Sequence, residues 1–427
     1  MVLPEVYRVR QTFDRARVKD ISLHVRAELD KLSLKGRVKP GQSVAITAGS
    51  RGIANISLII KTVIDVLKEL DAVPFVFPAM GSHGRATPEG QTALLAHHGI
   101  TETSMDVPIV SSMDVAEIGK TSDGIPVYVD RNALQADQIV VINRVRPHTK
   151  FKASIESGLM KMMAIGMGKQ KGAEYYHKAA LGSSFEKIIV DVARCVMEHA
   201  PILMGLAIVE NGYDETAHIV ALRPHEIEAK EKDLLALAKE MMPKLPFNEI
   251  DLLIVDELGK EISGTGIDPN VTGRNRDLLT AYPHPTKVKR LFVRDLTAET
   301  EGNALGIGLA DVTTRRLVEK IDTRATYMNC ITAISLEKAS IPMYFDTDRE
   351  AIGVALGSVG LTPPELSRIV RIRNTLVLEE VEVSAVYGDE LRHRPDLEIL
   401  RGPYPLPFDA QGNLEVLQVE SMRKGDV

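Results

Sequence analysis

Residues 43–53 read SVAITAGSRGI, in which a short apolar run gives way at once to glycines, a serine and an arginine. The apolar run has the length and composition of a buried β-strand. Residues 56–70 follow with apolar side chains at helical spacing, and residues 73–78, VPFVFP, form a second apolar run. A strand, a helix and a strand in this order predict a βαβ unit with parallel strands.

The same alternation of short apolar runs and helical stretches continues along the chain. Further helices are predicted at residues 184–199 and 225–242, the first of them with Ser183 and Glu186 as a capping box at its start. Further strands are predicted at residues 138–143, 205–209, 250–255, 290–294, 329–335 and 375–382. The chain is therefore expected to adopt an α/β fold with mostly parallel sheets and flanking helices.

Two prolines mark the predicted domain boundary. Pro243 and Pro246 follow the charged helix at residues 225–242, and a new buried strand begins soon after them. We therefore predict an N-terminal domain at residues 1–245 and a C-terminal domain at residues 246–427. The active site is expected in the cleft between these two domains.

The composition excludes several classes of protein. The chain has 427 residues, of which 44% are hydrophobic and 26% are charged, as in an ordinary globular protein. Its net charge is −6, so nucleic-acid binding is not expected. The sequence contains neither a signal peptide nor an apolar run of the about 18 residues that a membrane helix needs. The two cysteines, Cys195 and Cys330, have no CxxC partner, which argues against a thiolate metal site and for a cytoplasmic protein.

The loops after the strands are the first candidates for a site, because ligands of open α/β sheets bind beyond the carboxyl ends of the strands. The loop after residues 43–47 carries Ser50 and Arg51 at the start of a helix, where an anion is favoured. The loops after the next two predicted strands carry His83 and His148. Each pattern alone also fits a plain turn, a structural histidine or a solvated basic loop. The repeated arrangement favours a shared site.

A segment rich in glycine and lysine comes next along the chain. It contains Lys161, Gly166, Gly168 and Lys169, residue types that suit contacts to a phosphate. The segment matches neither a P-loop nor a Rossmann fingerprint, and its methionines are more typical of a core. His177 follows as a third histidine, so a zinc site built from three histidines is one interpretation.

A loop of the C-terminal domain is the last candidate. Residues 256–276 follow the predicted strand at residues 250–255 and are dominated by glycine and polar side chains. This composition is typical either of a functional loop or of a long surface loop. We predict that Lys260 and Asn270 of this loop contact the substrate, with Lys260 supplying a positive charge.

Taken in order, these segments resemble the lactate racemase family, the nickel-pincer nucleotide-dependent racemases and epimerases of 2-hydroxy acids. Thr47-Ala48-Gly49-Ser50-Arg51 resembles the first loop of the family, and Gly81-Ser82-His83 and Pro147-His148 resemble the loops that bear its two catalytic histidines. Lys161 and His177, sixteen residues apart (177 − 161), resemble the lysine that bears the cofactor and the histidine that binds nickel.

The resemblance implies an isomerase in which His83 and His148 act as acid and base. The hydride acceptor that it implies is the nickel complex of pyridinium-3,5-bisthiocarboxylic acid mononucleotide, supplied by separate biosynthetic enzymes. The residues expected to contact this cofactor are Ser50, Lys161, Gly166, Gly168 and Lys169, with His177 on the nickel. The residues expected to hold a small 2-hydroxy acid are Arg51, Lys260 and Asn270. Lactate, malate, longer aliphatic or aromatic hydroxy acids and sugar acids all fit this interpretation.

Three other interpretations of the same residues stay open. A zinc hydrolase would use His83, His148 and His177 and bind one zinc ion per chain. A nicotinamide-dependent hydroxy-acid dehydrogenase would bind NAD, although the sequence has no GxGxxG motif directly after a strand. A non-enzymatic anion-binding protein would bind its ligand through the glycine and arginine loops without turnover. The sequence does not specify the oligomeric state.

Overall fold

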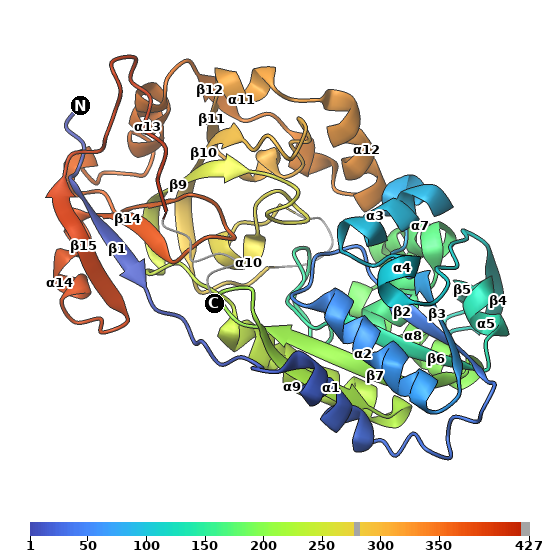
Figure 1. The fold of residues 1–427 in the computed structure, drawn as a ribbon. Helices are drawn as coiled ribbons and strands as arrows, with labels where there is room; N and C mark the ends of the chain where they lie inside the picture. The colour runs from blue at the N-terminus through green and yellow to red at the C-terminus, as the bar shows by residue number, and fades with distance from the viewer. Residues whose placement is uncertain (277–281, 420–427) are drawn as a thin grey trace. The chain divides into compact units, whose positions relative to one another are not determined.

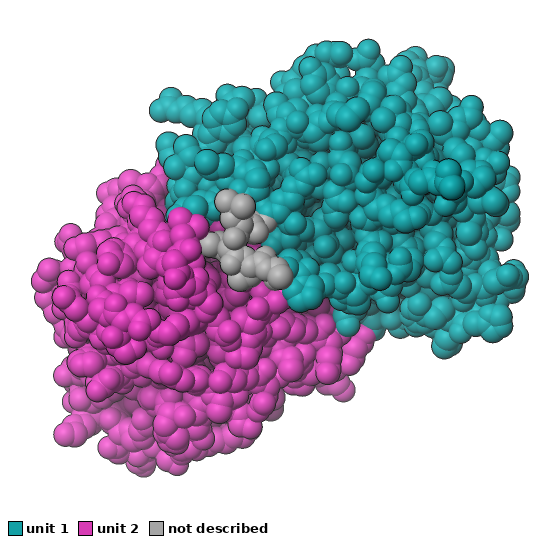
Figure 2. All heavy atoms as spheres, turned by 180° about the vertical axis from the view of Figure 1, so that it is seen from behind, with its two compact units in different colours: residues 1–13, 243–427 teal, residues 14–242 magenta. Residues whose placement is uncertain are grey.

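The computed structural model describes residues 1–276 and 282–419. The chain forms two compact units (Figure 2). Unit 2 consists of Asp14–Met242, and unit 1 joins Met1–Phe13 to the described residues of 243–427. The chain therefore passes between the units next to the prolines noted above. Its first thirteen residues belong with the C-terminal part of the chain.

The main sheet of unit 2 has five strands in the order β3-β2-β6-β7-β8 (Figure 1). The first four strands run parallel, and β8 pairs antiparallel with β7. Their bounds are Ser43–Ala48 for β2, Val73–Pro78 for β3, Gln138–Arg144 for β6, Ile202–Glu210 for β7 and Thr216–Leu222 for β8. A separate hairpin consists of β4, Val115–Lys120, and β5, Pro126–Asp130.

The helices of unit 2 contact this sheet, the hairpin or one another. They are α1 Ile21–Asp30, α2 Ile56–Glu69, α3 Pro88–His97, α4 Glu102–Met105, α5 Arg131–Gln135, α6 Leu159–Lys161, α7 Lys169–Ala179, α8 Phe185–His199 and α9 Pro224–Met241. In α2, Ile59, Val63 and Leu67 are 0% exposed and share one core cluster with Val44 and Ile46 of β2. The helical spacing of these side chains is the reason that this segment forms a helix on the sheet. A π-helical turn, Met162–Gly166, directly follows α6.

The sheet of unit 1 has eight strands in the order β12-β11-β10-β9-β13-β14-β1-β15. The five strands from β12 to β13 run parallel, and β14, β1 and β15 are antiparallel to their neighbours. The bounds are β1 Val6–Gln11, β9 Glu249–Leu258, β10 Lys287–Leu296, β11 Val312–Thr314, β12 Met343–Phe345, β13 Ile369–Ile372, β14 Glu380–Ser384 and β15 Leu397–Tyr404. Its helices are α10 Pro269–Thr272, α11 Arg315–Glu319, α12 Thr323–Ala333, α13 Asp348–Leu356 and α14 Gly388–Leu391.

A buried network of charged side chains ties four strands of unit 1 together. Arg371 of β13 is 1% exposed and pairs with Asp256 of β9 at 2.7 Å and with Glu382 of β14 at 2.9 Å. Arg294 of β10 contacts the same Asp256 at 2.9 Å and Asp348 of α13 at 2.8 Å. Removing one partner would leave a buried charge uncompensated, so the network acts as a single structural element.

Two of the predicted strands are wrong. Most of residues 329–335 belongs to α12, in which apolar side chains such as Tyr327 and Ile331 are exposed and therefore do not indicate a buried strand. Residues 375–382 reach only the start of β14. β13 is one of the strands that were not predicted, because the charged Arg371 lies within it.

The predicted capping box of α8 is also displaced by one residue. Ser184, not Ser183, accepts the hydrogen bond of the first turn, from the N–H of Lys187 at 3.0 Å. Glu186 instead accepts the N–H of Ser154 at 2.8 Å. The predicted α/β class, with mostly parallel sheets and flanking helices, is confirmed. Among the described residues, no helix has both the length and the apolar character that crossing a bilayer requires.

Candidate functional site

Three loops leave the carboxyl ends of β2, β3 and β6 in unit 2. Because β2 pairs with both other strands, these ends lie side by side at one edge of the sheet. A Cβ at Gly49, in the first loop, would lie 3.3 Å from Cε of Met162. The N–H of Gly81, in the second loop, donates to the carbonyl of Gly166 at 3.3 Å. The first two loops therefore pack against the segment that contains Lys161.

Ser50 and His83, from the first two loops, are joined by a hydrogen bond between Oγ and Nδ1. The carbonyl of Ser50 also accepts a hydrogen bond from Nε2 of His98 at 3.2 Å, which fixes the loop. Since a serine hydroxyl can donate or accept, the Ser50 contact is compatible with both neutral tautomers of His83 and with the protonated ring. The exposed His83 ring can therefore gain or lose a proton at Nε2 without leaving its place.

His148, in the third loop, is held by the backbone and by a buried carboxylate. Its Nδ1 accepts the backbone N–H of Lys150 at 3.1 Å, so the neutral ring carries its proton on Nε2. The N–H of His148 donates to Glu156 at 2.6 Å. Glu156 is 0% exposed, accepts the N–H of Ala153 at 3.0 Å and pairs with Lys239 at 2.6 Å. Glu156 thus closes the loop that carries His148.

His177 lies in the last turns of α7. Its Nδ1 is 2.6 Å from the carbonyl oxygen of Ala173, which can only accept, so Nδ1 donates and Nε2 holds the lone pair of the neutral ring. The ring packs on Phe185 with centroids 5.0 Å apart, and His148 packs on the same phenyl ring at 6.2 Å. The structure therefore brings His148 and His177 to one aromatic cluster, which Phe151 completes.

Lys161 is surrounded by positive charges. Burial, followed by the charges of Arg51, Lys150 and Arg146, lowers the pKa of its amine to about 7. A substantial fraction of this amine is therefore uncharged and nucleophilic near neutral pH. The cations come from the first loop, the third loop and α6, and their shared field favours an anionic ligand.

Gly166 and Gly168, predicted to contact the cofactor, are buried against the protein itself. A Cβ at Gly166 would lie 2.6 Å from the carbonyl oxygen of Ala79, and one at Gly168 would lie 2.7 Å from that of Ala164. Both distances are shorter than a real contact allows. The two glycines are therefore needed for close packing of the backbone, and this is the role that the structure gives them.

Lys169 is buried inside unit 2, and a cofactor-binding role for it stays a prediction. Its side chain is 0% exposed, and Nζ lies 2.9 Å from the carboxylate of Asp130, which is also 0% exposed. The ammonium group also donates to the carbonyl of Pro78 at the end of β3. Sequence alone could not separate this buried lysine from a phosphate-binding one, because both occur beside glycines.

Lys260 and Asn270 lie in unit 1, and their side chains form hydrogen bonds within the segment that follows β9. The ammonium group of Lys260 donates to the carbonyl of Gly264 at 2.8 Å. The side chain of Asn270, 6% exposed, donates to Asp268 at 2.8 Å and accepts the hydroxyl of Tyr282 at 2.8 Å. These contacts shape the loop after β9, and a substrate-binding role for the two residues stays a prediction.

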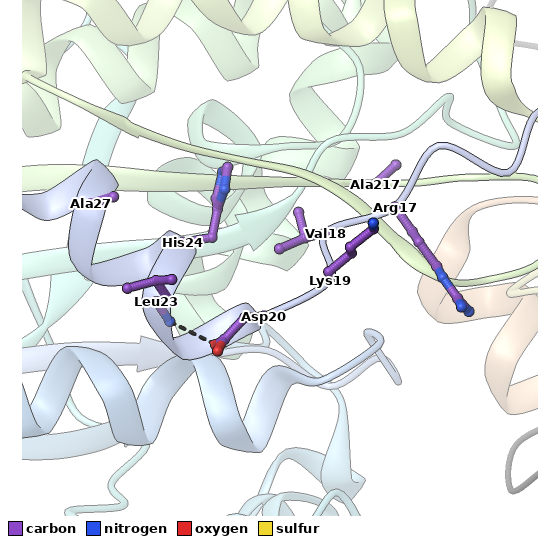
Figure 3. A pocket seen from close by; sticks show the side chains of 8 residues that line it. All are labelled: Arg17, Val18, Lys19, Asp20, Leu23, His24, Ala27 and Ala217. Atoms are coloured by element: carbon purple, nitrogen blue, oxygen red, sulfur yellow. Dashed lines mark hydrogen bonds between the residues drawn. The ribbon is translucent and has the colours of Figure 1, made fainter. Parts of the chain in front are cut away.

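A surface hollow of about 520 Å³ lies beside α1 (Figure 3). It is lined by residues before and within α1 and by Ala217 of β8. Asp20 in its wall accepts the N–H of Leu23 at 2.9 Å and so caps α1. None of the predicted site residues lines this hollow, so the loops, and not the hollow, are the candidate site.

The sequence of residues 6–188 matches the family model of the lactate racemase N-terminal domain. This segment belongs to the lactate racemase N-terminal domain family. The match spans β1 to the start of α8 and includes all three loops, Lys161 and His177. The family resemblance seen in the sequence is therefore confirmed. No curated protein matches the chain significantly.

One solved structure supports a similar fold for most of the chain. The lactate racemase apoprotein from Thermoanaerobacterium thermosaccharolyticum is similar with a TM-score of 0.52 at 13% sequence identity, over 87% of this chain and 98% of that one. A protein of Thermotoga maritima reaches a TM-score of 0.49 at 13% identity, over 77% of this chain and 84% of that one. At 13% identity, the first match shows a similarity of fold alone.

In the described parts of the chain, no three His, Cys, Asp or Glu side chains are placed to hold a metal ion. The three-histidine zinc site considered above is therefore not formed. Near the three loops, His177 has an imidazole ring that is oriented by a backbone carbonyl, as metal-bound histidines commonly are.

Three residues that shape the lactate racemase N-terminal domain were missed in the sequence. Glu156 anchors the His148 loop, Gln91 contacts the His83 loop, and Glu231 of α9 accepts the N–H of Met160 at 3.0 Å. All three side chains are 0% exposed. Their sequence context resembles that of surface residues, so only their burial in the fold reveals the role.

Proposed function

We propose that this protein is a racemase or epimerase of a small 2-hydroxy acid that uses a nickel-pincer nucleotide. The proposal rests on the family match and, above all, on the placement of His148 and His177 against the same phenyl ring. One imidazole is held as an Nε2–H donor and the other as an Nε2 ligand, and both pack on Phe185. We further propose a cytoplasmic location, with other enzymes supplying the cofactor.

The residues around Lys161 fit such a nucleotide. When bound, the nucleotide supplies a reversible acceptor for the hydrogen on the substrate's α-carbon. His177 offers one nitrogen ligand to its nickel, and Ser50 and the cations near Lys161 suit its anionic groups. The pKa of Lys161, lowered to about 7, leaves part of this amine uncharged and nucleophilic at neutral pH, next to the groups that would hold the nucleotide.

The histidines and Arg51 account for the rest of the proposed reaction. Arg51 holds the substrate carboxylate, since guanidinium binds carboxylates in a bidentate manner and keeps its charge. His83 takes the hydroxyl proton of one stereoisomer at Nε2 while Ser50 accepts its Nδ1–H. His148, with its proton on Nε2, donates to the same oxygen from its own loop and supplies the proton for the opposite stereoisomer.

The proposed function is tested by loading the protein with cofactor. The chain is co-produced with the nickel-pincer biosynthetic enzymes, and nickel per chain and the visible absorption spectrum are measured together. We expect near-stoichiometric nickel with a visible chromophore, followed by racemisation or epimerisation of one member of a panel of single-enantiomer 2-hydroxy acids. A protein that takes up zinc or no metal, and converts none of these acids, would contradict the proposal.

A further inference from the structure

The buried pair of Lys169 and Asp130 connects two elements of unit 2. Both side chains are 0% exposed, and the two charged groups are 2.9 Å apart. Asp130 ends β5, and its other oxygen accepts the N–H groups of Asn132 and Ala133 at 2.8 and 3.0 Å. Lys169 is the first residue of α7, the helix that also carries His177. The start of this helix is therefore fixed to the end of β5.

The same ammonium group extends the connection to the His83 loop. Lys169 donates to the carbonyl of Pro78, the last residue of β3, and to Oε1 of Gln91 at 3.4 Å. Gln91 lies in α3 and is 0% exposed. Its amide nitrogen donates to the carbonyls of Gly81 at 3.0 Å and His83 at 3.2 Å. A continuous chain of polar contacts thus runs from β5 through Lys169 and Gln91 to the backbone of His83.

The backbone of Lys169 indicates that this arrangement is specifically maintained. Its φ is +53°, in the left-handed region that side chains other than glycine adopt at a cost. Gly168, just before it, cannot carry a Cβ, which would lie 2.7 Å from the carbonyl oxygen of Ala164. The chain therefore enters α7 in a strained conformation that aims the lysine inward, and the buried contacts of the ammonium group compensate for it.

We propose that Asp130, Lys169 and Gln91 are positioning residues that hold the His83 loop in a fixed place relative to α7 and His177. This rests on the proposed function, in which His83 is the base and His177 the nickel ligand. A fixed separation between them would keep the base aligned with a cofactor bound at α7, since small displacements of a catalytic group are costly. A merely structural pair would stabilise unit 2 without controlling the His83 loop in particular.

Two variants of Gln91 separate these roles. Gln91→Met keeps the shape of the side chain but makes no hydrogen bond to the carbonyls of Gly81 and His83. Gln91→Glu keeps an acceptor for Lys169, and it replaces Gln91→Met in the test if Gln91→Met folds poorly. The matched control is Gln170→Met, because Gln170 is exposed on α7 and its amide donates to Glu174 at 2.8 Å, on the same helix and away from the His83 loop.

The first readout needs no turnover. Hydrogen exchange of the purified chain is followed by mass spectrometry for the peptide that covers residues 79–87. In the Gln91 variants we expect exchange of this peptide to rise by roughly tenfold, with α2 and α8 unchanged. The control should exchange like the unaltered chain. Unchanged exchange in residues 79–87, or an equal rise throughout unit 2, would overturn the positioning role.

The second readout uses the cofactor-loaded chain. We expect kcat to fall by roughly ten- to a hundredfold in the Gln91 variants, with KM and nickel content nearly unchanged. A loss of nickel in proportion to activity would overturn the positioning role, since it would show that the variants disturb cofactor binding. A loaded, unaltered chain that turns over no hydroxy acid would refute the proposed function, and the exchange result would still decide how the His83 loop is held.

Discussion

His148 and His177 pack against the same phenyl ring, that of Phe185, yet carry their ring protons on opposite nitrogens. The Nδ1 of His148 accepts the backbone N–H of Lys150 at 3.1 Å, whereas the Nδ1 of His177 donates to the carbonyl of Ala173 at 2.6 Å. Since backbone N–H groups only donate and carbonyls only accept, the two assignments follow from the contacts. The pair therefore offers one Nε2–H donor and one Nε2 lone pair, which suits a proton-transfer group beside a metal ligand.

Replacing His177 by alanine should release nickel. The variant removes the imidazole ligand and leaves the proton-transfer histidines untouched, so nickel per chain after cofactor loading should fall by roughly tenfold or more. His148→Ala should keep its nickel and lose turnover. His199→Ala is the matched control, because its Nδ1 contacts the carbonyl of Cys195 at 3.0 Å in the same helical geometry. Full nickel in His177→Ala, measured by elemental analysis, would remove this residue from the metal site.

The hydrogen bond from Ser50 should increase the catalytic efficiency of His83 as a base. His83→Ala should lower kcat by roughly 10²- to 10⁴-fold, the usual contribution of a general acid or base. Ser50→Ala deletes the partner of Nδ1 while keeping the imidazole, so a smaller loss of kcat, of about tenfold per nickel bound, is expected. Turnover numbers and nickel content of the loaded variants check this. Equal activity of His83→Ala and the unaltered protein would show that the base lies elsewhere.

The amine of Lys161 should react at an unusually low pH. Its pKa is lowered to about 7, so acylation of the cofactor-free chain should be half-maximal near pH 7, as read by peptide mass spectrometry. Acylation of an ordinary lysine is half-maximal near pH 10.4. Arg51→Gln removes one of the charges that lower the pKa and should move the midpoint upward. Lys178, exposed on α7, serves as the internal reference. Identical pH profiles for Lys161 and Lys178 would contradict the structure.

The local features of the fold could be predicted from the sequence, and the long-range ones could not. The strands β2, β3 and β6 and the helix α2 follow from apolar runs and helical spacing, and so do the loops with Ser50, His83 and His148. β1 escaped prediction because it pairs with β14 and β15, whose partner residues lie near the other end of the chain. Pairing over such a separation leaves no local pattern to read.

The surroundings of the candidate site residues could not be predicted, for a similar reason. Lys169 and Lys161 stand in the same glycine-rich segment and look alike in sequence. Only the tertiary structure places Asp130 and Gln91 beside Lys169, which makes it an internal lysine. It also gathers Arg51 and Arg146 around Lys161. Residue type and spacing identify the loops that bear the site, whereas burial decides which side chains serve a ligand.

Glu231 should make the stability of unit 2 depend on pH. Its carboxyl group is 0% exposed, accepts the N–H of Met160 at 3.0 Å, and lies where a Cβ on Gly158 would come within 2.5 Å of it. Burial raises its pKa from 4.5 to about 7. The folded chain therefore binds this proton more tightly than the unfolded chain. The corresponding stability is fully present below pH 4.5 and is lost as the pH rises through about 7.

Glu231→Gln keeps a neutral acceptor at this position and should remove that dependence. A shift of the Glu231 pKa from 4.5 to about 7 corresponds to roughly 3 kcal/mol in the free energy of unfolding. The free energy of unfolding of the variant should therefore rise by up to this amount relative to that of the unaltered chain between about pH 5 and pH 8. Thermal or denaturant unfolding measures this difference. Glu228→Gln, on the same helix, is the control. The pKa of Glu228 is lowered by its hydrogen bond with Arg194, so its effect should stay nearly constant over this range. Parallel stability curves for Glu231→Gln and the unaltered chain would show that the carboxyl group is already ionised in the fold and that the short helix bearing Lys161 is capped by a charge.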